Sequence, residues 1–183
     1  GTSLAGQAGG RGLVVPGPAP SSGEVDPDGR LGRVGPGVVL HHLNAAAGAH
    51  GLMFGPDVAT ASRATLGGMI SNNSAGARSV VHGLTADAVT ALDVVFADGS
   101  RATLRRGAGA PAVLEGCRPL AGAWEGPSLL RRVSGYNLDA LAGERPDWPR
   151  LVCGSEGTLA VLTGAELRLV PRPRARGLAL LPF

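Results

Sequence analysis

The sequence contains no lysine, few aromatic residues and only two cysteines. All 17 basic residues are arginine, aromatic residues make up 3% of the chain, and the formal net charge is +3. Nucleic-acid sites combine clustered positive charge with aromatic rings that stack on bases. Because the arginines are scattered singly or in pairs and few rings accompany them, the composition argues against a nucleic-acid partner.

Cys117 and Cys153 lie far apart, without the Cys and His spacing typical of a zinc site or an iron–sulfur cluster. Two cysteines also do not make the disulfide framework of a small secreted protein, so we expect a reducing compartment. No apolar run approaches the ~20 residues of a membrane-spanning helix, and no signal peptide is visible. Since the first residue is Gly1 and not Met, we expect the natural N-terminus to lie upstream.

Strand-like apolar segments alternate with glycine-rich connections along the chain. With 44% hydrophobic residues, 183 residues suffice for one domain with a substantial core. The segment 91–104 predicts two strands joined by a turn at Asp98-Gly99. We further predict a strand in 30–37, an amphipathic helix over Val38–Ala49, a long strand in 157–171 interrupted near Gly164, a loop after a short apolar run at 13–15, and loop or weak helix in 105–127. This mixture, without a regular βαβ alternation, predicts an α+β fold.

The stretch GPDVATASRATLGGMISNNSAG, residues 55–76, is rich in glycine and short polar side chains and holds little that could build a core. It matches neither the G-x-G-x-x-G loop nor the Walker loop of the common nucleotide-binding folds. Gly67 and Gly68 would let the main chain approach a flat or phosphorylated ligand and direct N–H groups toward it. The hydroxyls of the stretch and the amides of Asn72 and Asn73 are uncharged donors and acceptors suited to a heterocycle. On composition alone, a long glycine-rich turn without a ligand is the alternative.

Four motifs, taken together and in this order, resemble the FAD-linked oxidases of the vanillyl-alcohol-oxidase and p-cresol-methylhydroxylase type. They are GTSLAGQA at residues 1–8, GPD at 55–57 with TLGGMISNNSAGARSVVHG at 65–83, RRVSGYNLDAL at 131–141, and GSEGTLAVLTGAELRLVPRP at 154–173. Within that family the motifs are most similar to the D-lactate dehydrogenase and glycolate oxidase flavoprotein group. Because the motifs span nearly the whole chain, a chance match is improbable.

The resemblance implies a domain organisation. It implies an FAD-binding domain of the p-cresol-methylhydroxylase type over residues 1–176, truncated at its N-terminus, and the start of a substrate cap domain at 177–183. The fold would be α+β and would consist mainly of the second subdomain, an antiparallel sheet with flanking helices. The first subdomain and the cap, which carries the substrate-binding residues in this family, would be missing. We therefore expect a fragment of a larger oxidoreductase.

The resemblance also implies cofactor-contacting residues by position. They belong to the tail of a pyrophosphate loop, to the glycine-rich stretch and its continuation, and to a second segment near the end of the chain, where main-chain groups are expected to meet the adenosine side. They are Gly1, Thr2, Ser3, Pro56, Asp57, Thr60, Thr65, Gly67, Gly68, Asn72, Asn73, Ser74, Gly76, Glu156, Gly157, Thr158 and Val161. For Glu156, a structural carboxylate that caps a local turn is the alternative.

The implied chemistry belongs mainly to the cofactor: a substrate α-carbon would pass a hydride to flavin N5. The FAD would be held without a covalent bond, since neither GTSLAGQA nor residues 55–76 contains Cys or His. No side chain is a convincing catalytic base, and no metal site is expected. The four histidines, His41 and His42 on the predicted helix, His50 near its end and His82 in a loop, are expected to be ordinary surface or packing residues.

The implied substrate is a small 2-hydroxy acid of the D-lactate, glycolate or D-2-hydroxyglutarate type, bound by the full-length protein. An iron–sulfur electron-transfer partner or fused domain is a further implied partner; nucleic acid and a transmembrane segment are not expected. The implied location is the cytoplasm, either free or peripheral to the inner face of the membrane. Two rival hypotheses stay open: a non-catalytic remnant of the fold that binds FAD weakly or not at all, and a basic interaction module.

Overall fold

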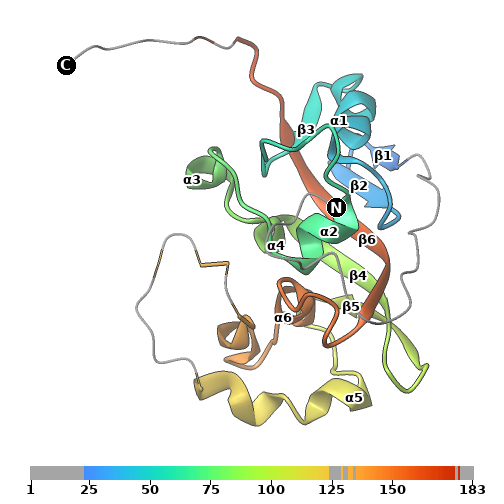
Figure 1. Cartoon of the computed structure of the whole chain (residues 1–183), viewed down its shortest axis with the longest axis vertical. Coiled ribbons are helices and arrows are strands. Elements are labelled where there is room, and N and C mark those ends of the chain that lie inside the picture. Colours follow the sequence, from blue (N-terminus) through green and yellow to red (C-terminus); the bar gives the residue numbers. More distant parts are fainter. Residues whose placement is uncertain (1–22, 124–128, 130–131, 134, 176, 178–183) are drawn as a thin grey trace.

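A computed structural model describes residues 23–123, 129, 132–133, 135–175 and 177. Its frame is a six-stranded antiparallel sheet with the order β1-β2-β6-β4-β5, in which β3 also pairs with β6 (Figure 1). The strands are β1 Glu24–Asp26, β2 Leu31–Val34, β3 Leu52–Phe54, β4 Val89–Val95, β5 Arg101–Arg105 and β6 Val161–Pro171. Together with short helices this confirms the predicted α+β class, an antiparallel sheet with flanking helices.

The strand β6 organises the sheet, because it pairs with β2, β3 and β4. It spans 11 residues; it ends at Pro171, as the sequence predicts, but begins at Val161 and not at residue 157. The predicted interruption near Gly164 is a register shift: Asp93 pairs with Gly164 while Val94 pairs with Leu162, which leaves Thr163 as a bulge. A bulge bends a strand without ending it.

The β4–β5 hairpin confirms the predicted turn. The backbone N–H of Phe96 donates to Ser100 O at 2.9 Å, and Gly99 has the positive φ of 82° that such a turn requires. Asp98 Oδ1 accepts the Ser100 N–H at 2.9 Å and closes the tip. The two strands therefore pair from Ala91–Arg105 to Val95–Arg101.

Short helices connect the strands (Figure 1). They are α1 Leu40–Gly48, α2 Leu66–Ser71, α3 Ser79–His82, α4 Thr85–Ala88, α5 Ala112–Glu115 and α6 Trp148–Val152, with 3-10 turns η1 Arg118–Gly122 and η2 Leu138–Leu141. The predicted amphipathic helix is α1, which buries Leu40, Leu43 and Ala47. In the predicted weak region, α5 and η1 form helical turns.

The glycine-rich stretch 55–76 is not the core-free loop that its composition suggests. It contains α2, whose Leu66, Met69 and Ile70 are at most 1% exposed and belong to the hydrophobic core. Thr65 begins this helix: its hydroxyl accepts the Gly68 N–H at 3.3 Å. Three apolar residues at helical spacing were enough to turn this stretch into a core element, despite the glycines around them.

Several predictions concern residues outside the described part of the chain. These are the apolar run at 13–15, most of the loop that follows it, the pyrophosphate-loop residues Gly1, Thr2 and Ser3, and nearly all of the segment assigned to the start of a cap domain. Among the described residues, no helix combines the length and the apolar character needed to cross a membrane.

Candidate functional site

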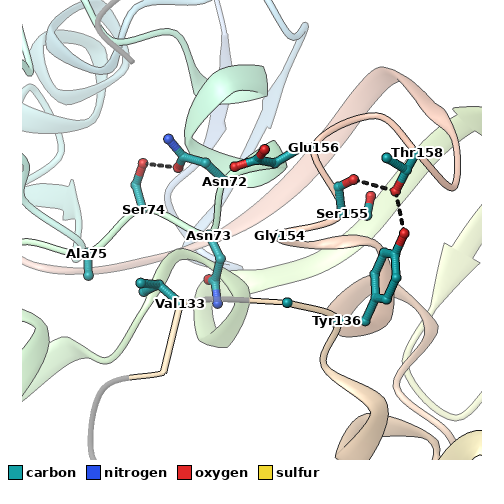
Figure 2. A pocket seen from close by; sticks show the side chains of 11 residues that line it. Asn72, Asn73, Ser74, Ala75, Val133, Tyr136, Gly154, Ser155, Glu156 and Thr158 are labelled. Atoms are coloured by element: carbon teal, nitrogen blue, oxygen red, sulfur yellow. Dashed lines mark hydrogen bonds between the residues drawn. The ribbon is translucent and has the colours of Figure 1, made fainter. Parts of the chain in front are cut away.

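A pocket of about 630 Å³ lies where two distant segments of the chain meet (Figure 2). Residues 72–75, which follow α2, form one wall, and Gly154, Ser155, Glu156 and Thr158, which follow α6, form another. Val133, Gly135 and Tyr136 complete the lining. The volume is in the usual range for small-molecule sites.

The two walls are hydrogen-bonded to each other through backbone groups of α2. The Gly154 N–H donates to Ile70 O at 3.0 Å, and the Glu156 N–H donates to Ser71 O at 2.9 Å. Gly154 has a φ of 84° and Glu156 a φ of 50°, so both residues adopt the left-handed backbone conformation. These two turns bring the second wall to α2. The carbonyls at the end of a helix lack intrahelical partners, and here they receive the second wall.

Asn73 ties the first wall to α4. It is 1% exposed, its φ is 50°, and its Oδ1 accepts the Ala86 N–H at 3.0 Å. Beside it, Ser74 O accepts both the backbone N–H and the hydroxyl of Thr85, at 3.1 and 2.8 Å. Asparagine tolerates the left-handed conformation better than most residues, and its side chain supplies an acceptor to a buried N–H. The amide oxygen of Asn73 is therefore engaged inside the protein.

Asn137 is a second buried asparagine whose side chain hydrogen-bonds to the backbone, here at the end of α6, just before the second wall. It is 4% exposed, and its Nδ2 donates to Arg150 O at 3.0 Å and to Cys153 O at 2.9 Å, at the C-terminal end of α6. The adjacent Tyr136 stands in the pocket, where its hydroxyl lies 2.8 Å from Thr158 Oγ1. The fixed position of Asn137 thus fixes the backbone from which the Tyr136 ring projects.

An ion pair joins the helices behind the two walls: Arg150 of α6 contacts Asp87 of α4. Burial opposes the ionisation of Asp87, but the hydrogen bond from Leu84 N–H and the hydrogen bond and charge of Arg150 outweigh it. The pKa of Asp87 consequently lies below its ordinary value. Burial raises the pKa of the nearby Cys153 thiol, which therefore stays neutral and forms part of the core.

The structure brings some of the predicted cofactor residues together and separates others. Asn72, Asn73, Ser74, Glu156 and Thr158 share the pocket. Gly157 lies between two lining residues, and its Cα faces open space. The residues that do not line this pocket are Pro56, Asp57, Thr60, Thr65, Gly67, Gly68, Gly76 and Val161.

Two of the separated glycines serve internal packing. A Cβ on Gly67 would lie 2.6 Å from Pro36 Cβ, and the Gly67 N–H donates to Pro36 O at 2.9 Å. A Cβ on Gly76 would lie 1.2 Å from the carbonyl oxygen of Asp57. We predicted that the N–H groups of the glycine pair point at a ligand. This is wrong for Gly67, whose N–H donates within the protein. The N–H of Gly68 donates to Thr65 Oγ1.

Other predicted side chains have identifiable partners as well. Asp57 pairs with Arg78 at 3.2 Å. The Glu156 carboxylate accepts no hydrogen bond from the described residues, and its backbone N–H donates to Ser71 O at the end of α2, so a carboxylate that caps a local turn is not what the structure shows. The prediction that His82 lies in a loop is wrong, because His82 is the last residue of α3. Its Cβ lies close to Gly55: a Cβ added to Gly55 would be 2.9 Å from it.

The sequence reasoning missed several residues that line the pocket. They are Ala75, Val133, Gly135, Tyr136, Gly154 and Ser155. A signal existed, because all of them lie in the motifs that carry the family resemblance. Among the described residues, no cluster of His, Cys, Asp and Glu could hold a metal ion.

The pocket offers polar groups with little charge. Glu156 is the only charged residue among the described lining residues. The backbone N–H groups of Ala75 and Gly157 donate to no residue that the structure describes. Such a set suits the edge of an uncharged heterocycle better than a phosphate, for which positive charge is expected.

Comparison with known proteins identifies the family of this chain. The sequence profile of the FAD binding domain matches residues 1–105. The chain is 35% identical over 160 residues to a D-lactate dehydrogenase of Archaeoglobus fulgidus, covering 87% of this chain and 29% of the relative. It is 34% identical over 174 residues to a D-2-hydroxyglutarate dehydrogenase of Pantoea ananatis (84% and 17%), and 32% identical over 153 residues to the glycolate oxidase subunit GlcD of Bacillus subtilis (84% and 26%).

The chain therefore belongs to the FAD-binding domain family of the vanillyl-alcohol-oxidase and p-cresol-methylhydroxylase type, and its cofactor is FAD. It is related to FAD-linked oxidoreductases, the D-lactate and D-2-hydroxyglutarate dehydrogenases and glycolate oxidase, and spans less than a third of the length of the three relatives above. The pocket fits part of this cofactor, because the uncharged hydroxyls and amides among its described lining residues suit a flavin or adenine edge.

Proposed function

We propose that the chain is the FAD-binding portion of a flavin-dependent oxidoreductase that oxidises a small 2-hydroxy acid of the D-lactate, glycolate or D-2-hydroxyglutarate type. The substrate class rests on the relatives, a D-lactate dehydrogenase, a D-2-hydroxyglutarate dehydrogenase and a glycolate oxidase subunit. When bound, FAD supplies a hydride acceptor at flavin N5. An iron–sulfur electron acceptor, fused or separate, stays part of this proposal.

The observation that carries the proposal is the joining of the two walls. Residues 72–75 and 154–158 lie far apart in the sequence, yet two backbone hydrogen bonds to α2 bring them to one pocket. FAD is extended, so its rings and its phosphates need donors from segments that only the fold brings together. In our proposal the walls hold an aromatic edge of FAD, and residues 1–3 belong to the pyrophosphate loop.

The chain's own residues would bind and orient the cofactor and would leave acid–base chemistry to groups elsewhere. Oxidation of a hydroxyl requires the loss of a proton as well as a hydride. The described lining residues include no histidine, and Glu156, the one carboxylate among them, is exposed. The base that takes the hydroxyl proton would therefore belong to a part of the enzyme outside this pocket.

The test is FAD binding by a matched pair of glycine variants. Gly157 and Gly99 have φ values of 81° and 82°, and an added Cβ at either meets nothing within 4 Å. Valine at either position should strain the backbone to a similar extent, because a β-branched residue is disfavoured at positive φ. Only Gly157→Val alters a pocket wall, so it should weaken FAD binding at least tenfold, while Gly99→Val binds like the parent.

The measurement is a titration of FAD followed by flavin absorbance and fluorescence. Equal affinities for the parent and both variants would remove the pocket from the proposal. If the parent itself takes up no FAD, the alternative of a non-catalytic remnant with weak or no FAD binding is favoured.

A further inference from the structure

A chain of two hydrogen bonds in the second wall ends at the pocket. Thr158 Oγ1 donates to the backbone carbonyl of Ser155 at 2.6 Å, and the Tyr136 hydroxyl lies 2.8 Å from the same Thr158 oxygen (Figure 2). The Thr158 N–H also donates to Ser155 O, at 3.0 Å, so the threonine is held at both its backbone and its side chain. The three groups form a fixed line from the main chain to the pocket.

The direction of this chain follows from counting protons. A carbonyl oxygen can only accept, so Ser155 O fixes the single hydroxyl proton of Thr158 on that side. Thr158 has no second proton to offer, so it accepts and Tyr136 donates. The phenol proton of Tyr136 is thereby used inside the protein. What Tyr136 has left for the pocket are the acceptor lone pairs of its oxygen.

Tyr136 is well placed to use those lone pairs. Its side chain belongs to the pocket lining and the residue is 43% exposed, while the neighbouring Asn137 is buried and held by two backbone carbonyls of the α6 region. The ring therefore projects from a rigid base into open space. A hydrogen-bonding group that is already oriented recognises a ligand without an ordering cost.

We infer that Tyr136 is a specificity-determining residue that accepts a hydrogen bond from an N–H group of the bound cofactor. This rests on the proposed function, since it assumes that the pocket holds an edge of FAD. FAD carries such donors in two places, the N3–H of the flavin ring and the amino group of adenine. A ligand that presents an acceptor at this position meets lone pairs and is disfavoured.

The experiment crosses three chains with three ligands. The chains are the 183-residue parent and two variants. Tyr136→Phe keeps the ring and removes the acceptor oxygen. Thr158→Ser keeps a hydroxyl at position 158 that can still orient the Tyr136 hydroxyl. The ligands are FAD, an FAD methylated at flavin N3, and an FAD whose adenine amino group is blocked as the 1,N6-etheno derivative. Dissociation constants come from equilibrium titration, and circular dichroism checks that each variant is folded.

The parent should bind one of the two blocked ligands about two- to tenfold more weakly than FAD, the range of one neutral hydrogen bond. In Tyr136→Phe that preference should vanish, and in Thr158→Ser it should persist. Weaker binding of the methylated ligand places the flavin edge at Tyr136, and weaker binding of the etheno ligand places adenine there. A merely structural tyrosine would lower the affinity for all three ligands alike.

The inference is overturned if the parent binds both blocked ligands as tightly as FAD, or if the preference survives in Tyr136→Phe. These outcomes differ from a failure of the proposed function, in which the parent binds none of the three ligands. In that last case the inference falls as well, because no cofactor edge would then be held at Tyr136.

Discussion

Asn73→Ala should destabilise the chain strongly without removing a direct ligand contact. Asn73 is 1% exposed, and its Oδ1 holds the N–H of Ala86, a residue that is 0% exposed. Alanine would leave this buried donor without its partner and would have to keep the left-handed φ of 50°. Asn73 therefore acts through the protein interior, although it lies in the wall of the pocket.

The magnitude combines two effects. An unsatisfied buried N–H costs about 1–3 kcal/mol, and holding alanine in the left-handed region adds roughly 1 kcal/mol. The free energy of unfolding should thus fall by about 2–4 kcal/mol. With an m value of about 2–3 kcal/mol per molar urea, the midpoint of unfolding should fall by about 1 M.

The matched control is Asn72→Ala, one residue earlier in the same wall. Asn72 is partly exposed, its φ is −103°, and its Oδ1 accepts a hydrogen bond only from the Ser74 hydroxyl among the described residues, at 2.5 Å. This change should cost under about 1 kcal/mol. Urea unfolding of the parent and both variants, followed by circular dichroism, measures the difference.

Two results would refute this reasoning. The buried hydrogen bond would not be the cause if Asn73→Ala were no less stable than Asn72→Ala. If Asn73→Ala kept its stability but lost FAD binding, the Asn73 side chain would be a ligand contact and not an internal support.

Other predictions concern pH, cofactor attachment and activity. The partners of Asp87 lower its pKa in the folded protein. Its contribution to the free energy of unfolding is therefore fully present at a pH above its unfolded-state pKa of about 3.9, and it is lost as the pH falls through the lower folded-state pKa. Unfolding titrations from pH 6 to pH 2 should show this loss, and Asp87→Asn should flatten it; an unchanged slope counts against the Asp87–Arg150 pair. Acid or heat denaturation should release bound FAD into the supernatant, and flavin that stays with the precipitate would contradict non-covalent binding. The purified chain should show no dye reduction with D-lactate, glycolate or D-2-hydroxyglutarate; steady turnover would demand a catalytic base that we have not identified.

Local sequence patterns were sufficient for the elements whose stability is mainly local. The β4–β5 hairpin follows from Asp98-Gly99, because a positive φ at Gly99 and a side-chain acceptor at Asp98 define the turn without help from the rest of the chain. The helix α1 and the strand β6 were predictable for another reason: their apolar residues mark a buried face, although β6 is stabilised by its pairing with β2, β3 and β4. The motifs are sufficient to identify the family, because four of them occur in the right order.

The sequence was misleading where a residue type has two uses. Gly67 was expected to open the main chain to a ligand, and the resemblance placed Gly76 in the cofactor loop, yet both are required by contacts within the protein, with Pro36 and with the Asp57 carbonyl. A missing Cβ allows any close approach, and only the tertiary structure shows whether a ligand or another part of the chain makes it. In the same way, Leu66 and its apolar neighbours became core because α2 packs inward.

The sequence by itself determined the fold class, the family and the motifs that carry the site, since turn chemistry, periodicity and motif order are local properties. Only the tertiary structure decided which residues of those motifs meet. Ile70 O and Ser71 O receive the second wall, and the Tyr136 hydroxyl lies 2.8 Å from Thr158 Oγ1. The contacts of Ile70 and Ser71 are backbone hydrogen bonds between segments about eighty residues apart. Because every residue other than proline carries the same backbone donor and acceptor, no residue type in the sequence marks such a contact.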